Sequence, residues 1–254
     1  MKYSSLSAAT LLIATAISIS APSLQAADNI GVGATAVKGA ELILDGSRKL
    51  LDDKWTYWKG PRFSSSLPIK WKVVDDPVDS GKKAIQTDDP AAKGGRYGTA
   101  DIVTKKKYRD FRLHIEFLVM KKRGNSGVYL QNRYEIQVLD NYKNQSNPKG
   151  QAGSVYKQHI PLVNACRPPG EWQTFDIIFR APYYDKDGKR VKMGTFTDYH
   201  NGILVQDKVN IFGRTNSNKP VAPDYKQPFF LQDHGSLVSY RNIWVRELKR
   251  APLD

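Results

Sequence analysis

The chain contains a single cysteine, Cys166, among 254 residues. An intramolecular disulfide and a cysteine zinc cluster are therefore both excluded. The four histidines, at positions 114, 159, 200 and 234, show no His-x-x-x-His spacing, so a histidine metal site would need ligands from distant segments. A hard cation held by carboxylate and amide oxygens would leave no local signature, and no EF-hand-like loop is present. We expect no organic cofactor, and a divalent metal stays an open alternative.

Long hydrophobic runs are also missing, which decides how the amino terminus is interpreted. Lys2 precedes an apolar stretch at residues 8–17 that is too short to span a bilayer comfortably, and Ala26 offers a small residue for cleavage. These features predict a signal peptide over residues 1–26 and an exported protein, periplasmic or secreted, with no membrane span after cleavage. A membrane anchor is the alternative; a lipidated one is excluded because no cysteine follows the run.

Acidic residues are outnumbered: 39 Lys and Arg against 25 Asp and Glu give a formal net charge of +14. This balance permits nucleic acid, an anionic membrane or an acidic polymer as partner. Because we expect export, nucleic acid is not an expected partner. The basic runs at residues 105–107 and 121–123 flank one predicted strand, and we interpret them mainly as solvated strand or loop ends.

No long helical period occurs after about residue 42. Short runs rich in Val, Ile, Tyr, Phe and Trp are instead separated by Gly, Pro, Asn and Asp, a pattern typical of all-β proteins. Apolar and polar residues alternate in residues 111–120 and 134–139, which predicts strands with one face toward the core. We expect further strands at residues 127–131, 175–179, 229–231 and 242–245.

The clearest hairpin signal is Asn201-Gly202, between predicted strands at residues 195–200 and 203–205. Asn-Gly favours a type I′ turn because both central residues need a positive φ. The sequence contains no internal repeats, and its amino-acid composition does not change along the chain in a way that would indicate a second domain. The sequence therefore predicts a flexible lead-in at residues 27–40 and one β-sandwich domain over residues 41–254.

Several motifs resemble those of one family when they are taken together and in order. They are Leu44-Asp45-Gly46, Tyr108-Arg109-Asp110-Phe111, GNSGVYL at 124–130, YEIQVLD at 134–140, PPGEW at 168–172, His200-Asn201-Gly202, LQDHG at 231–235 and RNIWVR at 241–246. The set resembles the 3-keto-disaccharide hydrolase domain family, also called 3-keto-glucoside 1,2-lyase/3-keto-2-hydroxy-glucal hydratase, over about residues 40–250. The resemblance implies a concanavalin A-like jelly-roll sandwich and an exported enzyme that processes sugars. The insert at 214–227 departs from the family pattern and leaves substrate preference open.

An ordinary glycosidase needs two carboxyl groups that flank the scissile bond. In the segment YEIQVLD, Glu135 and Gln137 share a face, but Gln137 cannot act as an acid or a base. Asp140 has the opposite parity unless a bulge intervenes. This strand therefore carries one usable carboxylate.

The substrate class that the resemblance implies, a 3-keto-glycoside, needs only one base. The ketone acidifies the proton on C2 because the carbanion is delocalised as an enolate, which then expels the substituent at C1. Water can add to the resulting 3-keto-2-hydroxy-glucal. We predict Glu135 as the base and Gln137 as a donor to the substrate or enolate, with Asn125 as a further polar contact.

The remaining candidates are His200 and His234, as general acids or metal ligands, and Asp233, as a substrate contact and their orienting partner. Trp244 alternates with Ile243 and Val245, so it is predicted to face a sugar-binding groove or solvent if those two are core.

Structural alternatives stay open for these residues. Glu135 could be a solvated residue of a half-exposed strand, and His200 could lie at a hairpin tip. Asp233 and Asn125 could be turn residues. Trp244, like the other four tryptophans, could be buried by core packing instead of binding a sugar ring. At the level of the protein, two other functions stay open: a non-catalytic carbohydrate-binding module without a working base, and a surface protein that binds polyanions in a salt-dependent way.

Overall fold

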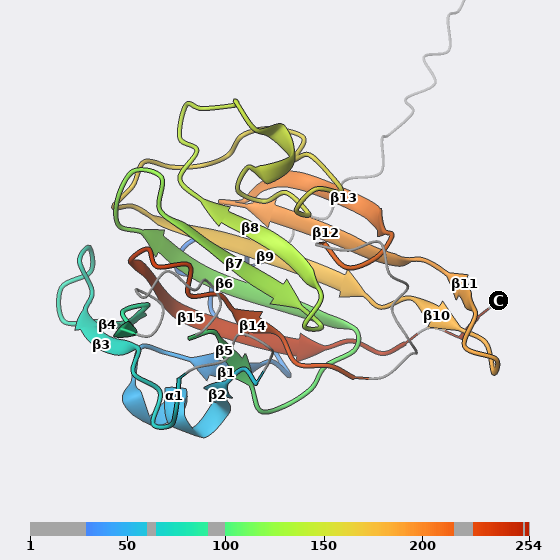
Figure 1. The fold of residues 1–254 in the computed structure, drawn as a ribbon, viewed down its shortest axis with the longest axis horizontal. Coiled ribbons are helices and arrows are strands. Elements are labelled where there is room, and N and C mark those ends of the chain that lie inside the picture. Colours follow the sequence, from blue (N-terminus) through green and yellow to red (C-terminus); the bar gives the residue numbers. More distant parts are fainter. Residues whose placement is uncertain (1–28, 60–64, 91–99, 216–225, 251, 254) are drawn as a thin grey trace, which may run out of the picture.

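The computed structural model describes residues 29–59, 65–90, 100–215, 226–250 and 252–253 (Figure 1). The predicted signal peptide at residues 1–26 and most of the insert at 214–227 lie outside these ranges, so the signal peptide stays a prediction. Within the described part of the chain, no helix is long and apolar enough to cross a bilayer.

Two antiparallel sheets lie one over the other and form an all-β jelly-roll sandwich, as predicted (Figure 1). Sheet A follows the order β13-β12-β9-β6-β15-β4-β3, with β1 paired to β15 as its eighth strand. Its strands are β1 (Glu41–Leu44), β3 (Lys72–Asp75), β4 (Lys83–Gln86), β6 (Phe111–Val119), β9 (Trp172–Arg180), β12 (Gly194–His200), β13 (Ile203–Ile211) and β15 (Val238–Glu247).

Sheet B has five strands in the order β2-β5-β14-β7-β8. They are β2 (Trp55–Tyr57), β5 (Ile102–Thr104), β7 (Asn125–Leu130), β8 (Tyr134–Leu139) and β14 (Phe230–Leu231). A small ribbon of β10 (Tyr183–Tyr184) and β11 (Arg190–Lys192) completes the described strands, and a 3₁₀ helix spans Pro148–Gly150. The pairing of β14 with both β5 and β7 brings segments far apart in the sequence onto one surface.

The core lies between the sheets and follows the predicted alternation. Leu113, Ile115 and Phe117 of β6 are fully buried, and they face Ile136 and Val138 of β8 within the same cluster. The predicted hairpin is confirmed as well: Asn201 and Gly202 have φ values of 54° and 80° and connect β12 to β13.

Two features differ from the sequence-based expectation. Helix α1 (Arg48–Lys54) was not predicted; Ser47 caps it by accepting a hydrogen bond from the Leu50 amide at 3.1 Å. Residues 29–35, within the predicted flexible lead-in, instead pack across the outer face of sheet A, and we call them the N-terminal strap. Their amides reach buried carboxylates: Gly31 donates to Asp176 at 2.8 Å and Gly33 donates to Glu116 at 2.7 Å.

Candidate functional site

Strand β8 directs Glu135 and Gln137 away from the core. Because Ile136 and Val138 belong to the core, alternation places Glu135 and Gln137 on the outer face of sheet B, where the sequence predicts them. Both are nevertheless almost inaccessible, with exposed fractions of 5% and 4%. Glu135 is therefore neither a solvated surface residue nor part of the apolar core.

The segment at residues 153–156 closes the free edge of β8. The Gly153 amide donates to the Gln137 carbonyl at 3.0 Å, and the Gln137 amide donates to the Ser154 carbonyl at 3.1 Å. The Tyr156 amide donates to the Glu135 carbonyl at 3.0 Å. Strand β8 is thus flanked on both sides, by β7 and by this segment.

The Glu135 carboxylate sits opposite Tyr129 of β7, whose hydroxyl hydrogen-bonds to it. Gly127 makes room for it, since a Cβ on Gly127 would lie 2.9 Å from Glu135 Oε1. Burial raises the pKa of Glu135 to about 7, although the Tyr129 hydroxyl and the charge of Lys157 act in the opposite direction. A carboxylate with this pKa is suited to take up a proton near neutral pH.

Amide side chains lie on the same face of the sheet as this carboxylate. Gln137 Nε2 donates to Asn125 Oδ1 at 3.0 Å, so the amide nitrogen of Asn125 remains as a donor. Gln232 extends the pairing of β14 with β7, because its backbone amide donates to the Gly127 carbonyl at 2.9 Å. The predicted pair Asn125 and Gln137 therefore does lie on the Glu135 face.

An aromatic row runs from the same carboxylate across sheet B. Tyr129 stacks on Phe230 with ring centroids 4.1 Å apart, and Phe230 stacks on Trp58 at 5.7 Å. Together with Val103 these rings form a small apolar cluster of their own, separate from the main core. Glu135 therefore lies where an aromatic row meets a group of polar amides.

Sequence reasoning missed several residues of this face: Phe230 and Trp58 of the aromatic row, and also Tyr129 and Gln232. Gln232 Nε2 donates to the Tyr129 hydroxyl at 3.4 Å, which links the two. A signal for Tyr129 was present: it has the same parity as Asn125 and Gly127 in the GNSGVYL motif. The position of Gln232 depends on the long-range pairing of β14, which local periodicity does not show.

His234 and Asp233 follow this pairing in the LQDHG motif. His234 is half-buried, and burial lowers its pKa. The paired residues of β14 are Phe230 and Leu231, so His234 lies three residues beyond the end of this strand. Asp233 acts in the turn: its Oδ1 accepts from the Gly235 amide at 3.1 Å, as the structural alternative foresaw. Its role as a substrate contact stays a prediction.

His200 is not on this face. It belongs to β12 of sheet A, with its side chain toward the core, where it contacts Phe175 at 4.9 Å between ring centroids and hydrogen-bonds Gln173 Oε1 at 3.0 Å. Full burial lowers its pKa to about 3, so the imidazole is neutral at ordinary pH. Its placement with Glu135 was wrong because the parity of β12 turns it inward, and the surface hairpin-tip alternative was wrong for the same reason.

Trp244 also lies elsewhere. Its parity is as predicted, since Ile243 and Val245 are core residues, but the groove or solvent that it was expected to face is occupied by the N-terminal strap. Trp244 is fully buried, stacks on His114 at 5.1 Å and donates Nε1 to the Ala34 carbonyl at 3.3 Å. It is separated from Glu135 by the full thickness of the sandwich.

The second carboxylate of the YEIQVLD segment has a local structural role. Asp140 accepts hydrogen bonds from the amides of Arg123 at 3.0 Å and Tyr142 at 3.2 Å. Glu135 is therefore the one carboxylate that this segment presents on the outer face. In the described ranges, no three His, Cys, Asp or Glu side chains are arranged to hold a metal ion, and a divalent metal stays an untested alternative.

Comparisons with known proteins agree with this architecture. A family model described as a 3-keto-alpha-glucoside-1,2-lyase-like domain matches residues 40–246. A Parabacteroides distasonis protein provisionally assigned as a glycosyl hydrolase is 36% identical, with a TM-score of 0.67, over 85% of this chain and 86% of that one. Another from the same organism is 21% identical, with a TM-score of 0.53, over 82% and 99% of the two chains. No curated protein matches the sequence. The chain belongs to the 3-keto-alpha-glucoside-1,2-lyase-like domain family.

Proposed function

We propose that this protein is an exported enzyme that cleaves 3-keto-glycosides by elimination. The observation that carries the proposal is Glu135: a buried carboxylate with a pKa of about 7 on the outer face of sheet B, which also carries the amide side chains of Gln137 and Asn125. Its family consists of 3-keto-glycoside lyase-like domains, which supports a sugar as substrate. Export is proposed from the signal features of residues 1–26.

In the first step, Glu135 removes the proton from C2 of the sugar. The electron pair moves into the C2–C3 bond, and the C3 ketone becomes an enolate oxygen. The free amide nitrogen of Asn125 donates to that oxygen, and Gln137 fixes the orientation of Asn125 through their hydrogen bond.

In the second step, the enolate re-forms the ketone and the bond between C1 and its substituent breaks. The leaving alkoxide takes a proton from water and departs as an alcohol; His234, whose pKa burial lowers so that its imidazole is mainly neutral near pH 7, donates a hydrogen bond to the leaving oxygen. The product is a 3-keto-2-hydroxy-glucal, and addition of water to its C1–C2 double bond yields the free 3-keto sugar. Glu135, now protonated, returns its proton to solvent.

Classical double displacement fits the site less well. It requires a second carboxyl group about 5–5.5 Å from the first. The nearest candidate in the sequence, Asp140, is used by two backbone amides instead. Proton abstraction next to a ketone needs one base, which is what this face provides.

The test compares two matched substitutions, Glu135→Gln and Glu171→Gln. Glu171 is an exposed carboxylate in the turn before β9, so it controls for the loss of one negative charge. With a 3-keto-glucoside as substrate and product separation by chromatography, we expect Glu135→Gln to reduce turnover by about 10²–10⁴-fold. Glu171→Gln should retain full turnover, and Glu135→Gln should still bind the sugar.

Two results would contradict the enzyme proposal. If wild-type protein binds the 3-keto-glucoside but leaves it unchanged, the protein is a carbohydrate-binding module. If Glu135→Gln retains turnover, the base is another residue. The parent glucoside, which lacks the ketone, should be unchanged in every case because its C2 proton is not acidic.

A further inference from the structure

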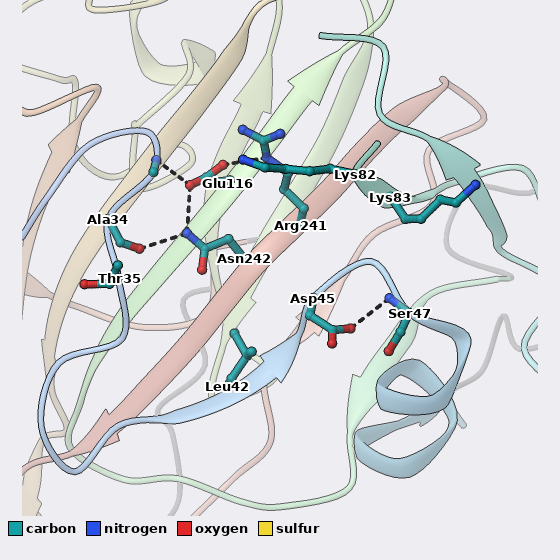
Figure 2. A pocket seen from close by; sticks show the side chains of 11 residues that line it. Ala34, Thr35, Leu42, Asp45, Ser47, Lys82, Lys83, Glu116, Arg241 and Asn242 are labelled. Atoms are coloured by element: carbon teal, nitrogen blue, oxygen red, sulfur yellow. Dashed lines mark hydrogen bonds and ion pairs between the residues drawn. The ribbon is translucent and has the colours of Figure 1, made fainter. Parts of the chain in front are cut away.

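A cavity lies on the other side of the sandwich from Glu135, on the outer face of sheet A. It has a volume of about 470 Å³, within the range of small-ligand pockets. The N-terminal strap forms one wall, β1 and the turn that leads to α1 form another, and the start of β4 forms a third (Figure 2). Residues of β6 and β15 form the floor. None of the residues predicted for catalysis lines it.

Asn242 presents a free acceptor to this cavity. Its Nδ2 donates to the Ala34 carbonyl at 2.9 Å and to Glu116 Oε1 at 2.8 Å. Both bonds lie on one side of the amide, so the carbonyl oxygen is directed to the other side, toward Leu42 (Figure 2). The residue has a φ of 44° at a β-bulge between β15 and β6, a strained backbone of the kind found at ligand sites.

The cationic floor of the cavity is already neutralised. Arg241 Nε donates to Glu116 Oε2 at 2.7 Å, and its Nη1 bonds Asp79 at 2.5 Å and also Asp76. At the rim, Lys83 pairs with Asp75, and Lys82 Nζ is 3.6 Å from Asp79. Because carboxylates outnumber the cations, the cavity has no excess positive charge to attract an anion. These carboxylates are in turn paired with Arg241 and the two lysines, which disfavours binding of a free cation.

The opposite wall adds a second acceptor and an apolar surface. Asp45 Oδ1 accepts from the Ser47 amide at 2.8 Å, which leaves Oδ2 available (Figure 2). Leu42 is 39% exposed and lines the cavity. Gly46 allows this wall to approach: its φ is 90°, and a Cβ there would lie 2.1 Å from the Lys83 carbonyl oxygen.

We propose that this cavity is a second carbohydrate site, which binds a neutral sugar without cleaving it. Asn242 Oδ1 and Asp45 Oδ2 would accept hydrogen bonds from sugar hydroxyl groups, and the lysine ammonium groups would donate. Leu42 would contact an apolar C–H face of the ring. The proposal depends on this cavity alone and not on the chemistry of Glu135, so it can fail or succeed independently.

The test uses nuclear magnetic resonance titration of the full chain carrying Glu135→Gln, so that no turnover intervenes. Trehalose serves as the neutral probe and glucuronic acid as its anionic counterpart. We expect trehalose to shift the backbone amides of Thr35 and Asp45, and glucuronic acid to bind at least tenfold more weakly. Equal or tighter binding of glucuronic acid would overturn the assignment of a neutral ligand, and unshifted amides at both residues would overturn the site.

A matched pair of substitutions locates the binding. Leu42→Trp would fill the cavity, whereas Val73→Trp adds the same ring to β3 at a residue that is also 39% exposed but does not line it. Leu42→Trp should reduce trehalose affinity at least tenfold, and Val73→Trp should not. Thr35→Trp places a ring in the cavity from the side of the strap, so it should reduce trehalose affinity as much as Leu42→Trp does. Similar affinities for all three variants would overturn the proposal, and turnover measured in the wild-type background should be unchanged in each.

Discussion

The two sheets each carry one buried glutamate on the outer face, and the protein treats these glutamates in opposite ways. Glu116 of sheet A is 1% exposed and Glu135 of sheet B is 5% exposed, so both are desolvated. Glu116 receives hydrogen bonds from His114, Asn242, Arg241 and the strap. Burial alone would raise its pKa, but these bonds outweigh burial and lower it to about 2.

Far fewer hydrogen bonds and charges stabilise the ionised form of Glu135. Tyr129 donates one hydrogen bond and Lys157 contributes charge at longer range, so burial prevails and the pKa rises to about 7. The same side chain is therefore permanently ionised on one face and able to exchange a proton on the other. Burial by itself does not identify a catalytic carboxylate; what matters is how completely its charge is satisfied.

The largest expected difference is in turnover. Glu135→Gln removes the proton acceptor while keeping the shape, so kcat on a 3-keto-glucoside should fall by about 10²–10⁴-fold. The free energy of unfolding should stay unchanged or rise at pH 8, because a buried carboxylate with little compensation is replaced by a neutral amide. Steady-state kinetics and urea denaturation on the same preparation measure both. A loss of stability together with activity would place Glu135 with Glu116 among the structural carboxylates.

Glu116→Ala should have the opposite effects to Glu135→Gln: it should lower the free energy of unfolding and leave turnover by the folded protein unchanged. It leaves the Gly33 amide without its acceptor and Arg241 without one of three carboxylates, so the free energy of unfolding should fall by about 3 kcal/mol. Below the unfolding transition, the surviving folded fraction should still turn over substrate. Urea denaturation followed by tryptophan fluorescence gives the first quantity. A stable but inactive variant would show that sheet A carries the chemistry.

Sequence reasoning predicted the face of each residue better than its surroundings. Alternation alone placed Glu135 and Gln137 on one face and Trp244 opposite Ile243, and the structure agrees. What covers a face is a tertiary property: the strap buries Trp244, and its packing depends on contacts across more than 140 residues. Local patterns contain no information about such contacts.

His200 shows a second limit of prediction from the sequence. It was grouped with Glu135 because both lie in motifs of the same family, but motif order says nothing about which sheet a strand joins. The pairing of β12 with β9 fixes His200 opposite Phe175, facing the core. Gln232 was missed for a related reason, since it reaches Tyr129 only through the long-range pairing of β14 with β7. The sequence therefore predicts which face of a strand a residue occupies, whereas the strand order of the sheets decides which residues lie next to it.

The two glutamates make the free energy of unfolding depend on pH in opposite directions. The pKa of Glu135 is raised from 4.5 to about 7, which stabilises the fold below pH 4.5; that contribution, roughly 3 kcal/mol, is lost as the pH rises through 7. The pKa of Glu116 is lowered to about 2, so its contribution is present above pH 4.5 and lost as the pH falls toward 2.

Unfolding free energies from pH 3 to 9 should therefore have a shallower neutral-side slope in Glu135→Gln and a shallower acid-side slope in Glu116→Ala; Asp233, whose pKa burial also raises to about 7, and Asp76, whose pKa is lowered, keep part of each slope. Activity should follow Glu135 alone: kcat/KM should rise up to tenfold per pH unit below about 7 and level above it, because only the ionised carboxylate removes a proton. A profile centred near pH 4.5 would show that Glu135 is solvated during catalysis.

The smallest effect is expected from Tyr129→Phe. Its hydroxyl lowers the pKa of Glu135 by donating a hydrogen bond to the ionised form, so the substitution should raise that pKa by about one unit. The kcat/KM profile would then move to higher pH and keep its plateau. Tyr134→Phe offers a matched control, since Tyr134 is a buried core residue of the same strand as Glu135 and points to the opposite face. A lowered plateau without a shift would mean instead that the Tyr129 hydroxyl contacts the substrate, which would extend the reacting face of sheet B from β8 to β7.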